Sequence, residues 1–379
     1  MSTRAHVERY YATIFPIEFV LQLLAHADAV DSNLWAIEKR EFVVTLPNAI
    51  KNTPVRVRYN TIATPDDWQR FLERFNKLLQ LDVGAVFYVS PSRVGDARDL
   101  AQLHEAVARR ELTFDIDLND YPDLRHCCGA ARKCCRACWP LAAAAALFLD
   151  SFLRHALGCR KIVWFFSGRR GIHCWVFDEQ FAHLDNQARE LLVDYIANEP
   201  ARLKAGAAPA ACFANVLSDV EPLFAKLIAS QSLFSVAERR AVVLEPLSLP
   251  PVLVDRWIAA GVLDYDSFSS IAMLAATTSA RHSDRRWYPH FELLYRCMFP
   301  RLDRKVTADA SHLLKLPFSL HPDTGNVCAP LTLRQLVDFD PTSPTLHMSH
   351  WTAETARAAV ERIKHMIGAA GAATSTNNK

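Results

Sequence analysis

Short runs of β-branched and aromatic residues recur through the first half of the chain and most constrain its fold. Between residues 41 and 177 they read EFVVTL, VRVRYN, VGAVFYVS, LTFDIDL, KIVWFFS and GIHCWVF. Such runs predict strands. The segments DDWQRFLERFNKLLQ (66–80) and the alanine-rich 140–157 have the spacing of helices. The pattern predicts an α/β (α+β) fold in which helices pack against a mixed sheet.

The rest of the chain is organised around this sheet. Two short amphipathic helices, broken by Pro16, are expected in residues 3–30. Helical spacing without a strand-like run continues from about 180 to 298, and short strands and turns return at 299–340. A last helix from 352 precedes a small, polar tail that we expect to be disordered. We therefore expect three units: a core of residues 1–190 and 291–350, an inserted helical subdomain at 191–290, and a C-terminal helix and tail at 351–379.

Composition excludes several classes of protein. Lys and Arg (43) nearly balance Asp and Glu (41), so there is no basic stripe that would itself indicate a nucleic-acid-binding protein. The longest apolar stretch, LAAAAALFL (141–149), is far shorter than the roughly 20 residues of a membrane span. The N-terminus has no secretory signal, so the ten cysteines are expected to be thiols or metal ligands rather than disulfides.

Asp115 and Asp117 lie two residues apart in a strand-like run. Residues at this spacing point to the same face of a strand, which places two carboxylates side by side. Paired anions need a compensating cation, and hard divalent ions prefer oxygen ligands. The pair is therefore a candidate site for Mg²⁺ or Mn²⁺. The alternative is an ordinary solvated strand face, which a bare Asp-x-Asp does not exclude.

The segment FFSGRRGIHCWVF (165–177) has the pattern of a β-hairpin whose tip carries two arginines between glycines. Arginine forks and close backbone N–H groups suit phosphate, so the tip is a candidate triphosphate pocket. The alternative is a solvated hairpin tip with arginines that serve solubility.

Five cysteines fall between residues 127 and 138. Four thiolates form a closed tetrahedral zinc site, which is structural because no ligand position remains open. The ligands chosen from the spacing are Cys127, Cys128, Cys135 and Cys138, with Cys134 as the competitor. A redox C-x-x-C is the alternative, but it leaves the other thiols unexplained.

Four motifs in order resemble the small, catalytic subunit of the archaeo-eukaryotic DNA primase. They are ELTFDIDLNDY, the cysteine cluster ending in CRACW, WFFSGRRGIHCWVFDE, and PRLDRKVTADASHLLKLPFSLHPDTG. YYATIFP and REFVVTL resemble the family's N-terminal segments. The resemblance implies a primase catalytic core with a zinc motif at 127–138 and an inserted helical subdomain. The gap between Cys128 and Cys135 is one residue longer than the family's usual gap, so the choice between Cys134 and Cys135 stays open.

The resemblance also implies roles for particular residues. Asp303 would complete a two-metal site with Asp115 and Asp117, and Glu41 would be a further acid of the active site. The nucleotide contacts that it implies are Ser167, Gly168, Arg169, Arg170, Gly171, His173, His312, Lys315 and His321, with Arg58 and Asp82 near the incoming nucleotide.

The function implied is synthesis of short RNA primers from ribonucleoside triphosphates on single-stranded DNA during replication. Two Mg²⁺ or Mn²⁺ ions would be catalytic and one Zn²⁺ structural. The implied partners are a large, iron–sulfur-containing primase subunit in a heterodimer and a replicative DNA polymerase complex, in the nucleus and without a membrane. The alternatives are a stand-alone primase-polymerase of the same superfamily in repair or lesion bypass, and a noncatalytic zinc-containing replication scaffold.

Overall fold

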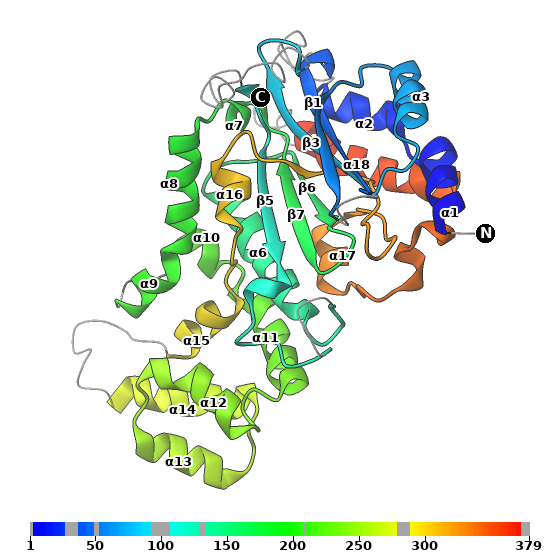
Figure 1. Cartoon of the computed structure of the whole chain (residues 1–379). Helices are drawn as coiled ribbons and strands as arrows, with labels where there is room; N and C mark the ends of the chain where they lie inside the picture. The colour runs from blue at the N-terminus through cyan, green and yellow to red at the C-terminus, as the bar shows by residue number, and fades with distance from the viewer. Residues whose placement is uncertain are drawn as a thin grey trace.

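Two β-sheets form the centre of the chain, and helices cover them (Figure 1). The computed structural model describes residues 3–26, 37–48, 53–91, 107–128, 133–205, 207, 209–278 and 289–372. The N-terminal sheet has the strand order β2–β1–β3–β4, and β8 also pairs with β3. Its strands are β1 (Arg40–Leu46), β2 (Val55–Asn60), β3 (Gln80–Phe87), β4 (Val107–Arg109) and β8 (Leu314–Lys315).

The second sheet has the order β5–β7–β6–β9. Its strands are β5 (Leu112–Asp117), β6 (Ile162–Phe166), β7 (Gly171–Val176) and β9 (Pro330–Leu331). In the register of β5 and β7, Asp115 lies opposite His173 and Asp117 lies opposite Gly171. This pairing brings the carboxylate motif next to the hairpin that carries the two arginines.

The predicted fold, in which helices pack against β-sheet, is confirmed, and only the direction of the strands differs from a mixed sheet. In the described parts of both sheets every strand pair is antiparallel. α6 (Trp139–His155) connects β5 to β6, which run in the same direction, but β7 lies between them and pairs with both. The crossover is therefore split by the β6–β7 hairpin, as in split β-α-β units. Strand composition alone does not specify this insertion.

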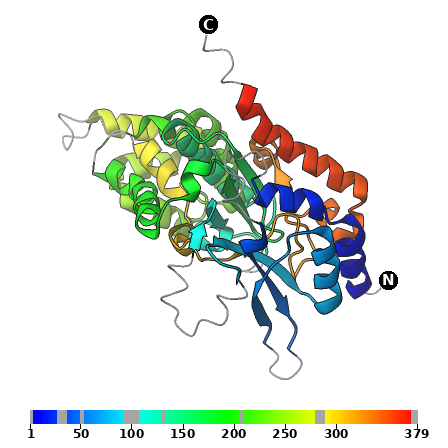
Figure 2. The ribbon, with the colours of Figure 1, turned by 90° about the horizontal axis from the view of Figure 1, so that it is seen from above.

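Helices pack on both sides of the sheets. Figures 1 and 2 show α2 and α3 beside the N-terminal sheet and α6 against the second one, whose other face is contacted by α18 at β6 and β9. The helices of the N-terminal half and the C-terminus are α1 (Thr3–Arg9), a π-helical turn (Tyr10–Ile14), α2 (Ile17–Leu24), α3 (Pro65–Arg74), α17 (Leu333–Val337) and α18 (Ala353–Ala372). Those between β7 and β8 are α7 (Glu179–Ala182), α8 (Asn186–Ala197), α9 (Glu199–Lys204), α10 (Ala211–Ala214), α11 (Leu217–Gln231), α12 (Ala237–Leu244), α13 (Pro251–Ala260), α14 (Tyr265–Thr278), α15 (Pro289–Met298) and α16 (Arg304–Ala308).

The second sheet is buried on both faces. Successive hydrophobic side chains along its strands point to opposite faces, and those on each face pack into a different core. In β6, Trp164 and Phe166 belong to the core that contains α6, whereas Val163 and Phe165 belong to the core that contains the N-terminal sheet and α18. This alternation follows the two-residue period of a strand. A sheet with two buried faces explains the nearly continuous apolar run IVWFF.

α6 ties the helical region to this sheet. Its run of five alanines (142–146) is fully buried and allows close approach of the sheet and α11, because interhelical distance depends on side-chain size. Phe148 packs its ring against Tyr295 and Phe299, with ring centroids 5.0 and 5.2 Å apart. Burying such an aromatic side chain stabilises the fold by about 1.5–3 kcal/mol. The helices after β7 therefore share one core with the second sheet, and their separation as a subdomain stays a prediction.

Three local differences from the predicted elements have physical causes. α3 ends at Arg74 rather than continuing to residue 80, because the N–H of Leu79 donates to Thr45 in β1 and the chain joins the sheet. The three-residue β4 is too short to give a periodic signal. α18 continues through Gly368 to Ala372, and residues 373–379 of the predicted tail lie outside the described part of the chain. Among the described helices, none is both long and apolar enough to cross a bilayer.

Candidate active site

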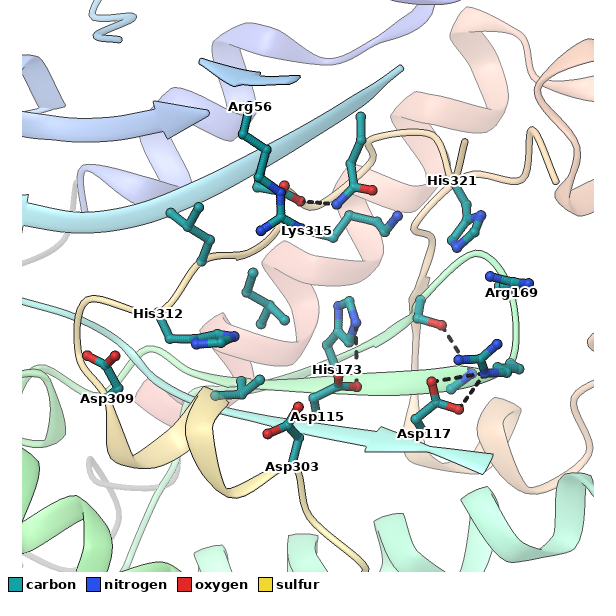
Figure 3. Close-up of a pocket in the computed structure, with 18 of the residues that line it drawn as sticks. Arg56, Asp115, Asp117, Arg169, His173, Asp303, Asp309, His312, Lys315 and His321 are labelled. Carbon is teal, nitrogen blue, oxygen red and sulfur yellow. Dashed lines mark hydrogen bonds and ion pairs between the residues drawn. The ribbon is translucent and has the colours of Figure 1, made fainter. Parts of the chain in front are cut away.

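A cavity of about 610 Å³ takes its wall from both sheets and from the segment that follows α15 (Figure 3). β2, β3, β5, β7 and β8 all contribute side chains to it. Of the residues expected at the metal and nucleotide sites, those that line the cavity are Arg58, Asp82, Asp115, Asp117, Ser167, Arg169, Arg170, Gly171, His173, Asp303, His312, Lys315 and His321. Glu41 and Gly168 are not part of the lining.

The three predicted metal-binding acids share one wall of this cavity. Asp115 and Asp117 both reach it from β5, as their spacing predicts. Asp303 comes from the turn before α16, and its backbone N–H donates to the carbonyl oxygen of Asp115 at 3.0 Å. Its side chain caps α16 by accepting from the N–H of Lys305 at 3.0 Å. Two segments far apart in sequence are therefore fixed together at the carboxylates.

The carboxyl group of Asp115 lies in a field that opposes its ionisation. Burial, followed by the negative charges of Asp117, Asp303 and Asp120, raises its pKa from 3.8 to about 8. Asp117 has a partner, because Nε of Arg170 donates to both of its oxygens at 2.7 and 3.0 Å. Clustered carboxylate oxygens are the ligands that hard divalent cations prefer. The three acids therefore fit a site for such cations.

Basic groups line the same cavity: His173 and Arg170 lie against Asp115 and Asp117, whereas Lys315 and His321 lie on the side away from the three acids (Figure 3). Lys315 in β8 lies opposite Asp82 in β3, and burial lowers the pKa of its amine. Burial, followed by the charge of Lys315, lowers the pKa of His173 to about 3 and that of His321 to about 2. Both imidazoles are therefore neutral near pH 7. Nδ1 of His173 is buried without a hydrogen-bond partner in the described part of the chain, as expected of a group that serves a ligand.

The turn between β6 and β7 is the tight hairpin that SGRRG predicts. The N–H of Ser167 donates to the carbonyl of Gly171 at 2.9 Å, and the N–H of Gly171 donates to Oγ of Ser167 at 3.1 Å. Gly168 has a φ of +90°, and a Cβ there would lie 2.7 Å from Cβ of His321. Only glycine satisfies both conditions, so the tip can carry Arg169 beside the cavity without strain.

Glu41 lies behind the cavity wall and holds Arg58. Its side chain is fully buried, and it accepts hydrogen bonds from Nε and Nη2 of Arg58 at 2.8 and 2.9 Å. These bonds raise the pKa of Arg58. Gly84 leaves room for the pair, because a Cβ there would lie 2.5 Å from a carboxylate oxygen of Glu41. Glu41 therefore reaches the cavity through Arg58, and a direct chemical role for it stays a prediction.

Sequence reasoning did not single out several residues of the lining. They are Arg56, Gln80, Val306, Asp309, Ser311, Leu313 and Leu314. The sequence could have indicated Arg56, because residues two apart on a strand share a face and Arg58 was already a candidate. Gln80 donates to Asp82 at 2.6 Å, and burial raises the pKa of that carboxyl group. Asp309 had no such signal, because it enters the cavity only through the packing of the short α16 against β5.

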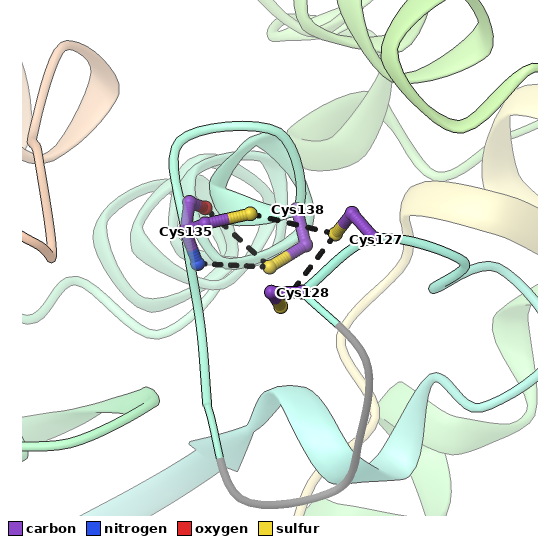
Figure 4. Close-up of side chains that lie close together, drawn as sticks. All are labelled: Cys127, Cys128, Cys135 and Cys138. Carbon is purple, nitrogen blue, oxygen red and sulfur yellow. Dashed lines mark hydrogen bonds between the residues drawn. The ribbon is translucent and has the colours of Figure 1, made fainter.

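Four thiols lie close together in the segment that follows β5 (Figure 4). Their sulfur atoms lie within 4.8 Å of one another, and they belong to Cys127, Cys128, Cys135 and Cys138. A cluster of this kind can hold a metal ion in tetrahedral geometry. Cys134 does not join it: its thiol donates to the carbonyl oxygen of Arg169 at 2.9 Å. The geometry favours Cys135 over Cys134 as the ligand.

Clustered carboxylates that share one cavity with basic side chains suit metal-assisted phosphoryl or nucleotidyl transfer. Residues 114–333, more than half of the chain, match the profile of the family described as DNA primase small subunit. The chain belongs to the DNA primase small subunit family. The resemblance of its sequence motifs to that family is confirmed, and the chain is an enzyme of the primase type whose catalysis depends on metal ions.

Similar proteins from other organisms span most of the chain. The DNA primase small subunit of Drosophila melanogaster is 31% identical over 366 residues, which cover 89% of this chain and 78% of that protein. The one from Saccharomyces cerevisiae is 27% identical over 345 residues, with 86% and 80% covered. The archaeal one from Pyrococcus furiosus is 26% identical over 249 residues, with 61% and 66% covered.

Proposed function

We propose that this chain is a DNA-directed RNA polymerase that condenses ribonucleoside triphosphates into short primers on a single-stranded DNA template during replication. The observation that carries the proposal is the convergence of Asp115, Asp117 and Asp303 in one cavity that basic side chains also line. Phosphoryl transfer needs little covalent chemistry from a protein, and positioning with electrostatic stabilisation supplies most of the rate. This cavity offers both.

The three acids hold two Mg²⁺ or Mn²⁺ ions in the proposed site. When bound, such ions activate the primer 3′-hydroxyl and neutralise charge on the α-phosphate and the leaving pyrophosphate. The chain's own task is to fix the carboxylates. β5 sets the spacing of Asp115 and Asp117, and the hydrogen bond from the N–H of Asp303 to the carbonyl of Asp115 fixes the third acid. Arg170 holds Asp117 and must share it with a metal ion.

The basic side chains of the cavity hold the triphosphate in this proposal. The side chains that carry it are Arg169, Arg170, His173, Lys315 and His321, with Ser167, Gly168 and Gly171 shaping the hairpin tip. Because the two histidines are neutral, they orient phosphate oxygens through hydrogen bonds rather than through charge. His312, Asp82 and Arg58 also line the cavity, and in this proposal they contact the sugar and base of the incoming nucleotide.

The cysteine cluster holds one structural Zn²⁺ through Cys127, Cys128, Cys135 and Cys138 in this proposal. Four thiolates leave no open position for chemistry. The catalytic core is proposed to comprise residues 1–190 and 291–350, with the helical subdomain at 191–290 and the C-terminal unit at 351–379. The absence of strands among the described residues from 177 to 313 supports the middle unit.

The partners are proposed to be a large primase subunit in a heterodimer and a replicative DNA polymerase complex, acting in the nucleus. The names of the eukaryotic relatives, which call each of them a small subunit, support a larger partner. The charge of this chain supports it as well. Its net charge is only +2, and neutralisation of phosphates dominates DNA binding, so a partner would supply part of the template affinity.

The test is de novo RNA synthesis by the purified chain on a polypyrimidine template with Mg²⁺ or Mn²⁺, with NTPs and dNTPs compared. We expect Asp117→Ala to abolish dinucleotide synthesis, because it removes a carboxylate of the cluster. Asp255→Ala removes an exposed carboxylate from α13 and should leave synthesis unchanged. Near-normal synthesis by Asp117→Ala would refute the metal assignment, and a preference for dNTPs would refute the primer chemistry.

A further inference from the structure

Each carbonyl group at the tip of the β6–β7 hairpin is held by a different segment of the chain. The carbonyl of Gly168 accepts a hydrogen bond from Oγ1 of Thr324 at 2.7 Å. The carbonyl of Arg170 accepts a hydrogen bond from the backbone N–H of Leu118, the residue that follows β5, at 3.2 Å. Between these two, the carbonyl of Arg169 accepts from the thiol of Cys134 at 2.9 Å. The sulfur that the metal cluster does not use is therefore engaged at the nucleotide site.

We propose that Cys134 is a positioning residue for nucleotide binding, which fixes the peptide unit that joins Arg169 to Arg170. This inference rests on the proposed function, because it assigns a task within the same site. A peptide unit is planar, so holding its carbonyl oxygen also fixes the direction of its N–H and restricts the backbone dihedrals on either side. The thiol thereby sets the directions in which two adjacent arginine side chains leave the backbone.

Both guanidinium groups depend on that direction. Nη1 of Arg169 pairs with Asp323 at 2.8 Å, and Nε of Arg170 pairs with Asp117 at 2.7 Å. The two arginines therefore point to different carboxylates across the tip. Cys134 itself is buried and does not line the cavity, so it cannot touch a nucleotide there. Its effect must pass through the backbone of the hairpin.

The described parts of the cysteine loop, residues 127–128 and 133–138, are anchored to the same end of the second sheet by a second contact. Arg125 donates to the carbonyl of the residue that follows β5 at 2.8 Å and to the carbonyl of Lys133 at 2.5 Å, and it lies 3.8 Å from the sulfur of Cys128. Cys134 directly precedes Cys135, one of the four clustered thiols. A metal ion bound by Cys135 and the other three thiols would fix the adjacent Cys134 and keep its thiol at the hairpin, which would couple metal binding to nucleotide binding.

The experiment measures three quantities on the full-length chain: KM and kcat for ATP in template-directed synthesis, equilibrium binding of ATP with Mn²⁺, and zinc content after acid release. Cys134→Ala removes the donor, and Cys134→Ser replaces it with a hydroxyl. Cys159→Ala is the matched control, a buried thiol that belongs to neither the cluster nor the cavity lining. Loss of one hydrogen bond predicts an increase of about three- to tenfold in KM and in the Kd for ATP.

We expect Cys134→Ala to show that increase with kcat within about twofold of wild type and with full zinc content, because an ordinary hydrogen bond and no ligand is lost. Cys134→Ser should recover much of the affinity, and it also serves if the alanine variant does not fold. An unchanged KM in Cys134→Ala overturns the inference, and so does loss of zinc, which would make the residue a metal ligand. Wild-type protein that neither binds ATP nor synthesises RNA would instead refute the proposed function.

Discussion

Replacing Asp115 by Asn should stabilise the metal-free protein while it abolishes activity. Burial, followed by the charges of Asp117 and Asp303, raises the pKa of Asp115 to about 8. If fully expressed, this shift means that at pH 7 the folded state, which keeps a proton that the unfolded chain releases, is destabilised by about 4 kcal/mol relative to the unfolded chain. The side chain retains 24% of its exposure, and water screens part of the repulsion. We therefore expect the neutral amide to raise the free energy of unfolding by about 1–3 kcal/mol.

The assay is thermal and urea unfolding of wild type and Asp115→Asn in EDTA at pH 7. For a chain of this size the expected gain corresponds to an increase of about 1–4 °C in Tm. Asp255→Asn is the control, because it removes the same charge from an exposed position on α13. Adding Mn²⁺ should stabilise wild type by mass action and stabilise Asp115→Asn much less. The difference in the free energy of unfolding between Asp115→Asn and wild type should therefore decrease, and then change sign, as the metal concentration rises.

The pH dependence has a definite sign. The folded state keeps the proton of Asp115 up to about pH 8, whereas the unfolded chain releases it near 3.8, so the folded state binds more protons between these values. In EDTA this group should lower the stability of wild type as pH rises through that window, and the contribution should be absent in Asp115→Asn. If Asp115→Asn is no more stable than Asp255→Asn at pH 7, or if the two show the same pH slope, the carboxylates do not repel as the geometry indicates.

Three further predictions concern other contacts. Arg170→Ala should raise the nucleotide KM before it affects stability, and steady-state kinetics with an unchanged KM would count against a phosphate role. Glu41→Gln should raise the nucleotide KM by about tenfold because it releases Arg58, and this cost is typical of a charge-assisted hydrogen bond. Adding Glu41→Gln to Arg58→Ala should raise KM little further. Additive effects of the two substitutions in a double-mutant cycle would contradict the coupling of these residues. Glu111→Gln should lower the free energy of unfolding by about 3–5 kcal/mol in urea titrations, because it breaks the buried pair with Arg40 at 2.7 and 2.8 Å. Burial alone would raise the pKa of Glu111, but Arg40 lowers it well below 4.5, so in wild type this stability should be present above about pH 4.5 and lost as pH falls below it, whereas the variant should lack that dependence.

The part of the site that follows from local rules was predictable from sequence. The two-residue period of a strand placed Asp115 and Asp117 on one face, and the glycines around the arginine pair indicated a hairpin. Asp303 and Lys315 had no local signal, because they reach the cavity only when α16 and β8 pack against β5 and β3. The family motifs indicated these two residues, and periodicity did not.

The order of the strands within the sheets and the position of Glu41 could not be predicted, because both depend on packing between segments that are far apart in the sequence. The insertion of β7 between β5 and β6 is decided by where a hairpin folds back, and the same apolar runs would suit a parallel sheet. Glu41 carries the residue type of a catalytic acid. Its distance from the chemistry depends on the bulge in the β1–β2 pairing and on the space beside Gly84, neither of which composition reveals.

The face of β5 that bears the acids explains why its two carboxylates differ. Thr113, Asp115 and Asp117 follow one another on this face from the interior to the cavity mouth, with Thr113 fully buried and the side chains of the two acids 24% and 31% exposed. The deeper acid has the raised pKa, whereas the outer one forms the ion pair with Arg170. A cation that approaches the cluster therefore displaces a proton from the inner position and competes with a guanidinium at the outer one. Because an incoming triphosphate would draw Arg170 toward itself, nucleotide binding should free Asp117 for metal, and the affinities for the two ligands should rise together.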